Sequence, residues 1–316
     1  MNAGSTLQCC NTPHTITNKI QKHMISVIIT AYNVQDFIQD AIKSVLRQTF
    51  KDVEIVVVCD KPTDETEILV DEIAAKDSRI RVIKNERNVG VGMSRKVGIE
   101  AANGQYVMFL DGDDCYDNDT FLQDLYDCAV NTGAQIVSGG VKVLHQDGSW
   151  DATCYGNTIV EGTDKVMRFW GNRTVYLVNR LIDKRLFEQI PYSPRRYVED
   201  IPIIIPMLYI ANKVAYIDNI GYVYRMREES LTHTTNRIKN VIFRGLCWCD
   251  LMEFFSANDS SIIEMSNMKS FIYNIIKTLN SDNVEMEQIQ PYIVEYAELW
   301  ARLNRIISIE QVAFKI

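Results

Sequence analysis

The chain has 316 residues, of which 47% are hydrophobic and 23% are charged, and its formal net charge is −8. This is the composition of an ordinary globular protein, either one large domain or a domain with an appendage. The acidic balance argues against nucleic-acid binding, so an anionic ligand would need a metal or a few placed arginines. The eight cysteines lack the spacing of a metal site, which predicts reduced thiols and a cytoplasmic protein.

The start of the chain is polar, and Met24 stands just before the first apolar run. We therefore expect residues 1–23 to be a disordered leader, with Met1 and Met24 as alternative natural starts. No stretch of about twenty apolar residues is present, so the sequence predicts no membrane-spanning helix. A peripheral position at the inner face of a membrane is compatible with this pattern.

Short apolar strands alternate with helical patterns through the first half of the chain. Continuous apolar strands with helices between them predict an α/β fold whose mostly parallel, Rossmann-like sheet is covered by helices on both faces. The predicted strands are Ile25–Thr30, Val53–Cys59, Ile80–Ile83 and Tyr106–Asp111, and the helices between them are Asp36–Gln48, Glu65–Lys76 and Val91–Ala102.

The pattern changes in the second half. A helix near 120–131 and a strand at Ile136–Val143 lead into a hairpin-like turn at 145–149. Residues 150–235 mix short strands, loops and helices, and the region 236–316 is predicted to be helical. The expected elements there are strands at Lys213–Ile217 and Gly221–Tyr224, helices at Val241–Phe255 and Ile262–Leu279, and a final amphipathic stretch from 293 to 307.

Polar residues follow each of the first four predicted strands, at the sheet edge where ligands bind in such folds. Asp111 and Asp113 end the fourth strand and offer hard oxygen ligands to Mn²⁺ or Mg²⁺, with Gly112 letting the backbone turn tightly. The alternative is turn and helix-capping chemistry, in which we expect Asp114 to take part.

Two common nucleotide-binding motifs are absent. Gly90-Val-Gly92 resembles the start of a dinucleotide fingerprint, but the next glycine is Gly98, and the fingerprint belongs after the first strand. No Walker-type glycine loop with Lys and Ser or Thr is present. These patterns argue against a hydride-transfer cofactor and against a P-loop nucleotidase.

Several short motifs together resemble family 2 glycosyltransferases, in the order and spacing of that family over about residues 25–231. The resemblance implies a nucleotide-sugar-binding fold of the GT-A type at 24–235, with a nucleotide-binding half at 24–134 and an acceptor half at 135–235. The motifs are Ile25-Ser-Val-Ile-Ile-Thr-Ala-Tyr-Asn33, Ser44–Phe50, Asp60-x-x-Thr-Asp64, Asn88-x-Gly90 with Ser94-Arg95 and Gly98, and Gly104-x-Tyr106 before the acids at 111–114.

The resemblance also implies roles for single residues. Asp113 is expected to be the direct metal ligand, and Asp111 the acid beside the ribose and a second ligand. Thr30 and Asp60 are expected to contact the nucleotide base. Alternatives are strand-end capping for Thr30 and Asn33 and a helix-surface charge for Arg95. The complete predicted nucleotide site is Thr30, Tyr32, Asn33, Asp60, Arg95, Asp111, Gly112, Arg227 and Ser230.

Two adjacent acids in the second half resemble the family's pair before the acceptor site. Asp200 is expected to be the catalytic base, with Glu199 as a supporting or alternative acid. The alternative is a pair of charges favoured by a helix N-terminus. Arg225, Arg227 and Ser230 resemble the segment that packs over the donor diphosphate, and a solvated strand end is the alternative for Arg225.

The chain departs from the family pattern at several positions, which leaves the donor-loop geometry and the sugar open. Cys59 stands where relatives commonly have an acid, and Lys61-Pro62 replaces the usual Gly-Ser. Lys96 stands where Asn often follows the arginine, and Arg227 stands where a His is frequent.

The expected reaction is inverting transfer of a sugar, with a UDP-sugar favoured as donor, to a hydroxyl of a glycan or lipid-linked glycan in surface polysaccharide or glycoconjugate synthesis. The alternatives are a noncatalytic sugar-nucleotide-binding or scaffold protein, and a sugar nucleotidyltransferase. The latter would carry a glycine-rich loop where Thr30-Ala-Tyr-Asn33 stands.

The C-terminal stripe of Trp300, Leu303 and Ile307 predicts core or homodimer packing, with a shallow membrane contact as the alternative.

Overall fold

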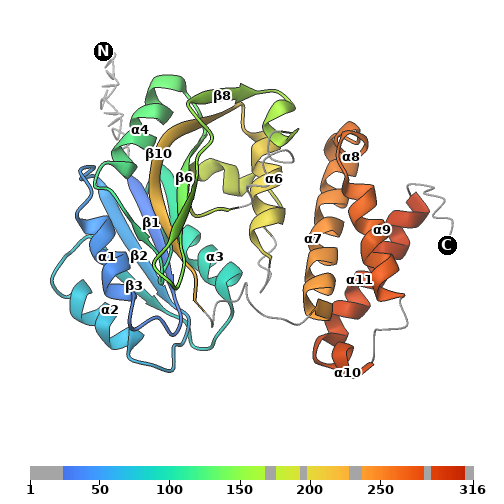
Figure 1. The fold of residues 1–316 in the computed structure, drawn as a ribbon, viewed down its shortest axis with the longest axis horizontal. Coiled ribbons are helices and arrows are strands. Elements are labelled where there is room, and N and C mark those ends of the chain that lie inside the picture. Colours follow the sequence, from blue (N-terminus) through green and yellow to red (C-terminus); the bar gives the residue numbers. More distant parts are fainter. Residues whose placement is uncertain (1–23, 168–175, 193–197, 228–236, 281–285, 310–316) are drawn as a thin grey trace, which may run out of the picture.

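The computed structural model describes residues 24–167, 176–192, 198–227, 237–280 and 286–309, so the predicted leader and Ser230 lie outside the described residues. The described strands form one ten-stranded mixed sheet in the order β3-β2-β1-β4-β9-β6-β10-β5, with β7 beside β6 and β8 beside β10. Helices cover both faces of this sheet, and a group of C-terminal helices packs beside α6 (Figure 1). The predicted α/β fold with a helical C-terminal region is confirmed.

The first four long strands are parallel, because each is linked to the next by a helix that crosses back over the sheet. Helices α1 and α2 cover one face of this half and α3 covers the other (Figure 1). Side chains on both faces of β1 are buried, which explains its continuous apolar sequence. The elements are β1 (Ile25–Ala31), α1 (Ile38–Leu46), β2 (Val53–Cys59), α2 (Thr66–Ala74), β3 (Ile80–Lys84), α3 (Val91–Ala101) and β4 (Tyr106–Asp111).

In the second half, β9 joins the two parts of the sheet, because it pairs antiparallel with both β4 and β6. The two predicted strands near 213–224 are one long strand, β10, whose register with β6 shifts between Tyr216 and Tyr222. The other elements are β5 (Cys115–Tyr116), α4 (Phe121–Thr132), β6 (Ile136–Leu144), β7 (Trp150–Thr153), β8 (Thr158–Glu161), β9 (Arg180–Asp183), η1 (Lys184–Glu188), α6 (Asp200–Ile210) and β10 (Lys213–Arg225).

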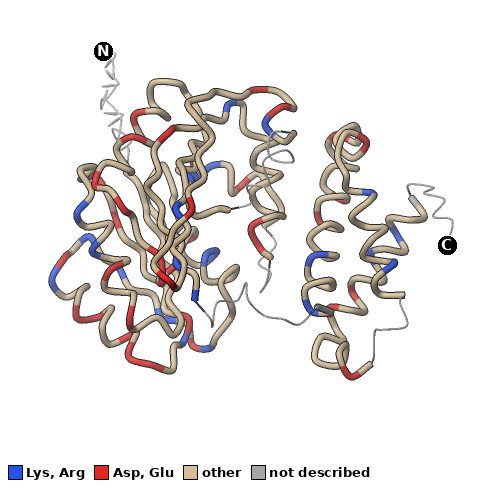
Figure 2. The backbone as a smooth tube through the Cα atoms, viewed as in Figure 1, with Lys and Arg blue, Asp and Glu red and all other residues tan. Residues whose placement is uncertain are grey.

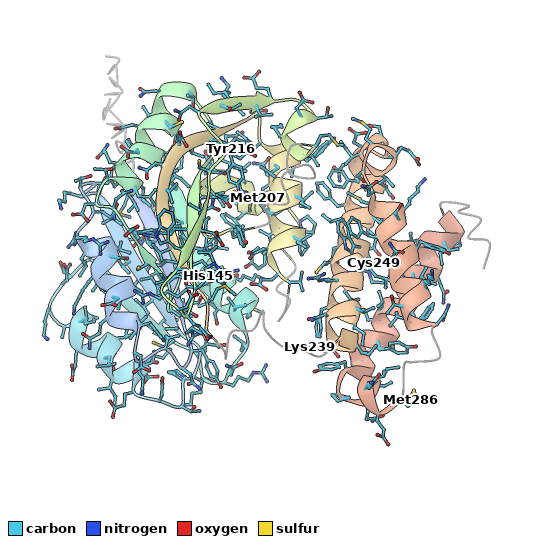
Figure 3. The ribbon with its side chains drawn as sticks, in the orientation of Figure 1. His145, Met207, Tyr216, Lys239, Cys249 and Met286 are labelled. Carbon is cyan, nitrogen blue, oxygen red and sulfur yellow. The ribbon has the colours of Figure 1, made fainter. Side chains whose placement is uncertain are left out.

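The predicted hairpin turn at 145–149 is confirmed, since His145 and Ser149 close it by a backbone hydrogen bond and β6 pairs antiparallel with β7. Between the sheet and α6 the space is filled by side chains, among them Met207 and Tyr216 (Figure 3). This packing holds the N-terminus of α6 close to the carboxyl end of β4.

The C-terminal helices pack mainly on one another through α7. The predicted single helix at 262–279 is divided by Ser266, whose backbone is extended. Leu303 lies in the helical core and Trp300 packs against it, which confirms the core interpretation for these two residues, whereas Ile307 is half-buried and its part in a homodimer stays a prediction. The elements are α7 (Arg237–Asn258), α8 (Ser261–Met265), α9 (Met268–Leu279), α10 (Met286–Ile289), η3 (Gln290–Tyr292) and α11 (Ile293–Ile309).

Aromatic rings join the helical group to the sheet domain. Tyr209 of α6 packs edge-on against Phe254 and Phe255 of α7, with ring centroids 6.0 and 5.4 Å apart. Among the described residues, no helix combines the length and the apolar character needed to cross a bilayer. Acidic and basic residues are interspersed along the outer helices, and no broad basic face is visible in this view of the described chain (Figure 2).

Candidate active site

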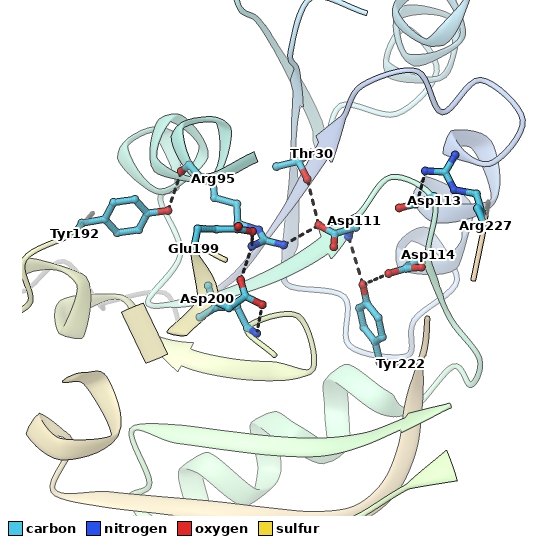
Figure 4. Close-up of polar contacts among 12 residues, drawn as sticks. Thr30, Arg95, Asp111, Asp113, Asp114, Tyr192, Glu199, Asp200, Tyr222 and Arg227 are labelled. Atoms are coloured by element: carbon cyan, nitrogen blue, oxygen red, sulfur yellow. Dashed lines mark hydrogen bonds and ion pairs between the residues drawn. The ribbon is translucent and has the colours of Figure 1, made fainter. Parts of the chain in front are cut away.

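A single arginine connects the two halves of the site. Arg95 lies on α3 and is only 3% exposed. Its Nη1 donates to Oε1 of Glu199 at 2.7 Å and to Oδ1 of Asp200 at 2.6 Å, while Nη2 donates to Oδ1 of Asp111 at 2.9 Å (Figure 4). The alternative of a helix-surface charge is therefore wrong for Arg95. This guanidinium joins the end of β4 to the start of α6.

The carboxyl groups around Arg95 are electrostatically strained. Burial, followed by repulsion from Asp200, raises the pKa of Glu199 to about 7, although Arg95 opposes this. Burial also raises the pKa of Asp200 above its ordinary range, again against the effect of Arg95. One guanidinium does not neutralise three carboxyl groups, so this pocket holds a proton more readily than an exposed acid does.

Asp200 is the more accessible member of the adjacent pair. Its side chain is 22% exposed, against 11% for Glu199. Asp200 is the first residue of α6, and its Oδ2 accepts a hydrogen bond from the backbone N–H of Leu177 at 3.3 Å. Val198, two residues before Asp200, has a left-handed φ of 57°, a conformation that a β-branched residue rarely adopts. The chain enters α6 through a backbone conformation that packing must hold.

The segment 111–114 after β4, here called the acid run, lies directly against the end of β1. Oδ1 of Asp111 accepts from the Thr30 hydroxyl at 3.3 Å, and Gly112 N–H donates to the Thr30 carbonyl at 3.0 Å. A Cβ on Gly112 would lie 2.8 Å from that carbonyl oxygen. The predicted tight turn is present, since the Asp114 N–H donates to the Asp111 carbonyl at 2.9 Å, and the close approach of the two strand ends also requires the glycine.

Asp113 pairs with a predicted donor-site residue. Arg227 Nη2 forms a short ion pair with Oδ2 of Asp113, and its guanidinium lies over the Phe37 ring, 5.1 Å from the centroid. Arg225 lies over the same ring and donates weakly to the Asp113 carbonyl at 3.4 Å. The Nε of Arg227 is buried without a hydrogen-bond partner among the described residues, so this donor can still take an acceptor.

Asp114 is a fully buried tether between the acid run and β10. Its carboxylate accepts from the Tyr222 hydroxyl at 2.5 Å and from the Arg225 backbone N–H at 2.8 Å. Burial and the neighbouring acids raise its pKa well above the ordinary value. The predicted capping role of Asp114 is wrong, because α4 is preceded by Thr120 and the N–H of Leu122 in its first turn donates to the Gln48 side chain at 3.1 Å.

Other predicted nucleotide-site residues lie in the loops after β1 and β2. The Asn33 side chain exchanges hydrogen bonds with Thr63, which ties these loops together, and the neighbouring Tyr32 is 45% exposed. The Asp60 carboxylate accepts from the backbone N–H groups of Val89 and Gly90 at 2.9 and 2.8 Å. Asp60 thus fixes the loop before α3, and its contact with a base stays a prediction.

The departure from the usual Gly-Ser pair has a backbone consequence. Lys61 has a left-handed φ of 54°, a conformation that glycine adopts without steric cost. Lys61 therefore adopts this backbone conformation at a steric cost that glycine would not have.

Sequence reasoning missed three residues that shape the site. Tyr222 contacts the acid run, Tyr192 donates to the Gly92 carbonyl at 2.9 Å, and Phe37 supports both arginines. Tyr222 belongs to an alternating pattern in β10, since Tyr224 follows two residues later on the same face. This alternation of tyrosines was the one sequence signal that could have indicated a role for Tyr222 in the site.

Asp111 and Asp113 are the residues that would hold a divalent cation. Each keeps one carboxylate oxygen that no described side chain engages, because Arg95 and Arg227 bind the other one. Within the described residues, no group of three or more acidic, His or Cys side chains forms a metal site alone. Two carboxylates completed by phosphate oxygens are a common ligand set for Mg²⁺, so these residues fit a cation that binds together with a diphosphate.

Comparison with known proteins identifies the family. A family model described as glycosyl transferase family 2 matches residues 26–191, which is over half of the chain. The chain belongs to glycosyltransferase family 2. The motifs after the strand ends and the fold of the first half are therefore those of a glycosyltransferase, as the sequence resemblance implied.

Three curated relatives are similar to this glycosyltransferase. GlyG of Streptococcus pneumoniae is 25% identical over 304 residues, which cover 91% of this chain and 97% of GlyG. The uncharacterized glycosyltransferase EpsJ of Bacillus subtilis is 33% identical over 218 residues, which cover 66% of this chain and 63% of EpsJ. WfaP of Escherichia coli, named as a UDP-Glc:α-D-GlcNAc-diphosphoundecaprenol β-1,3-glucosyltransferase, is 42% identical over 29% of this chain and 36% of WfaP.

Solved structures share the fold. TarS 1–349 of S. aureus superimposes with a TM-score of 0.65 at 19% identity, covering 90% of this chain and 81% of that chain. The same protein in complex with UDP-GlcNAc gives a TM-score of 0.62 at 20% identity, over 90% of this chain and 83% of that chain. The match extends beyond the family region, so the GT-A type architecture is shared over most of the chain.

Proposed function

We propose that this glycosyltransferase moves a sugar from a UDP-sugar to a hydroxyl of a glycan or lipid-linked glycan, with inversion at the anomeric carbon, in surface polysaccharide synthesis. The single observation that carries the proposal is the bridge from Asp111 through Arg95 to Asp200. It brings the end of the donor-side strand and a partly exposed carboxylate into one site.

The donor side suits a nucleoside diphosphate. The strand ends around Thr30, Tyr32 and Asp111 offer polar groups and an exposed ring for the nucleoside, and Arg227 offers a buried donor for the diphosphate. A UDP-sugar is favoured because TarS binds UDP-GlcNAc and WfaP is named for UDP-Glc. When bound at Asp111 and Asp113, Mn²⁺ or Mg²⁺ would offset the negative charge that develops on the departing diphosphate.

The acceptor side suits an alcohol nucleophile. A hydroxyl is a weak nucleophile near neutral pH, so Asp200 takes its proton as the new glycosidic bond forms. Arg95 holds Asp200 in place and, through Asp111, fixes its position relative to the donor. Attack from the face opposite the diphosphate inverts the anomeric carbon.

A UDP-release assay tests the proposal. Purified protein is incubated with UDP-GlcNAc, UDP-Glc or UDP-Gal and a GlcNAc-diphosphate lipid, with Mn²⁺, Mg²⁺ or EDTA. We expect metal-dependent UDP release with one donor, loss of transfer in Asp200→Asn with UDP binding kept, and loss of metal-dependent transfer in Asp113→Ala. Near-normal transfer by Asp200→Asn would show that another group is the base.

A noncatalytic sugar-nucleotide-binding protein is the second candidate. Its supporting observation is the ion pair between Asp113 and Arg227, which occupies one oxygen of the proposed metal ligand. The same assay separates the two, because a binding protein would show a UDP-induced rise in melting temperature without UDP release from any donor.

A further inference from the structure

An exposed aromatic residue directly precedes the backbone contact to the proposed base. Tyr176 is 39% exposed, whereas the next residues, Leu177 and Val178, are buried. Large apolar rings on a surface are ordinary when scattered, but they gain meaning when they lie in a polar site where a ligand would cover them. The backbone N–H of Leu177 donates to the Asp200 carboxylate, and Tyr176 is the residue directly before Leu177.

The backbone that carries this ring is anchored on both sides. Leu177 N–H donates to Asp200 at 3.3 Å, and the Tyr176 carbonyl accepts from Nε of Arg180 at 2.7 Å. Arg180 is fully buried and also contacts Ser138 on the central strand β6. A ring held by an anchored backbone loses less conformational freedom when a ligand packs on it, which favours binding.

A second tyrosine, Tyr224, lies within electrostatic range of Tyr176 on the acceptor half. Tyr224 is half-buried on β10, on the same face as Tyr222, which binds Asp114. Burial, then the nearby Tyr224 and Asp200, raise the pKa of Tyr176, which places these three groups within electrostatic range of one another. The exposed donor-side ring, Tyr32, instead follows β1, in the nucleotide-binding half of the chain.

We propose that Tyr176 is the platform on which the sugar ring of the acceptor packs, so that one of its hydroxyls faces Asp200. A pyranose presents an apolar C–H face that packs on an aromatic ring, while its hydroxyls point sideways to polar groups. The ligand is therefore the terminal sugar of the acceptor glycan, whether that glycan is free or lipid-linked. This inference rests on the proposed transferase function.

The test separates acceptor binding from donor binding. Tyr176→Ala, Tyr176→Phe and wild type are compared for UDP release without acceptor, and for transfer to a GlcNAc-diphosphate lipid and to a soluble GlcNAc glycoside. Loss of ring packing should raise the acceptor KM of Tyr176→Ala about tenfold for both acceptors, with the donor KM and the acceptor-free UDP release within about twofold. Tyr176→Phe keeps the ring and should keep the acceptor KM.

Two further variants make the result specific. Tyr273→Ala removes a comparably exposed ring from α9 and should change neither KM, whereas Tyr32→Ala should raise the donor KM alone. An unchanged acceptor KM in Tyr176→Ala, or an equal rise in both KM values, overturns the inference. Absence of UDP release by wild type from every donor would instead refute the proposed function. A rise in KM for the lipid acceptor but not for the soluble one would place the lipid, and not the sugar, against Tyr176.

Discussion

Nη1 of Arg95 donates to Oδ1 of Asp200 at 2.6 Å, although the two residues are 105 positions apart in the sequence. The same guanidinium binds Asp111, so the donor-side strand end and the start of α6 are held by one buried cation. Removing one partner of a buried ion cluster leaves the other charges buried and unpaired. The resulting loss of folding free energy is larger than the net stabilisation that the intact cluster provides. Arg95 is thus the residue on which both the geometry and the stability of the site depend.

We expect Arg95→Met to abolish turnover and to lower the free energy of unfolding by about 3 kcal/mol near neutral pH, because three carboxyl groups lose their cation. Chemical denaturation and UDP release measure the two effects. Arg95→Lys keeps the charge but not the fork of donors, so it should recover part of the stability and little of the activity. Equal stability of Arg95→Met and wild type would contradict the buried bridge.

Glu199→Gln should stabilise the protein above neutral pH. Glu199 loses its proton near pH 4.5 when unfolded, but its pKa is about 7 in the folded protein. Between these values the folded state binds more protons than the unfolded state, so the stability contributed by this group falls as pH rises and is constant above about 7. The glutamine side chain in Glu199→Gln does not ionise over this pH range, and its amide oxygen can still accept a hydrogen bond from Arg95.

The expected gain in the free energy of unfolding for Glu199→Gln is therefore near zero at about pH 4.5 and reaches about 1–3 kcal/mol at about pH 8. Urea denaturation across this range measures it. Glu100→Gln, an exposed change on α3 close to Lys96, is the control and should show no such pH dependence. A constant difference between Glu199→Gln and wild type would contradict the raised pKa.

Arg227→Gln should separate metal binding from nucleotide binding. The ion pair occupies Asp113 in the ligand-free protein, so its loss should leave Mn²⁺ affinity unchanged or higher. Binding of UDP with Mn²⁺ should weaken about tenfold, because the buried donor for the diphosphate is lost. Calorimetry measures both affinities, and the exposed change Arg305→Gln is the control. Unaltered UDP affinity would show that Arg227 does not reach the diphosphate.

The sequence predicted the parallel half of the sheet closely. Val53–Cys59 and Tyr106–Asp111 are strands with the predicted bounds, because continuous apolar runs between turn residues have few alternatives. The single strand β10 was predicted as two, since Asp218 and Asn219 interrupt the apolar pattern while the backbone stays extended. Local pattern does not reveal a register shift that depends on the neighbouring strand β6.

The site was predicted less completely than the fold. Arg95, Asp111 and Asp200 were assigned by resemblance, but their direct contact depends on how α3 and α6 pack, which no local signal encodes. Asp114 was misassigned for the same reason, because its partner Tyr222 is 108 positions away. Capping is a local property and tertiary burial is not, so an acid beside a predicted helix has two explanations until the fold is known.

A thiol on the C-terminal helices contacts the backbone directly before the two proposed catalytic acids. Sγ of Cys247, on α7, donates to the carbonyl of Val198 at 3.1 Å, directly before Glu199 and Asp200. Val198 has the left-handed backbone that the chain needs to enter α6. We expect Cys247→Ala to lower kcat about fivefold with donor KM unchanged, because a hydrogen bond of about 1 kcal/mol that holds the acids in place is lost.

Cys247→Ser restores a donor at the same position and should recover most of this kcat. Cys249→Ala is the matched control, because Cys249 is equally buried on the same helix and its truncation costs similar packing. Steady-state kinetics at saturating donor and thermal unfolding of the three variants measure the effects. If Cys247→Ala and Cys249→Ala lose kcat in proportion to their loss of melting temperature, the thiol is only a packing residue, and α7 supports the site by bulk contact. A fall in kcat confined to Cys247→Ala makes the helical region a positioning element for Asp200.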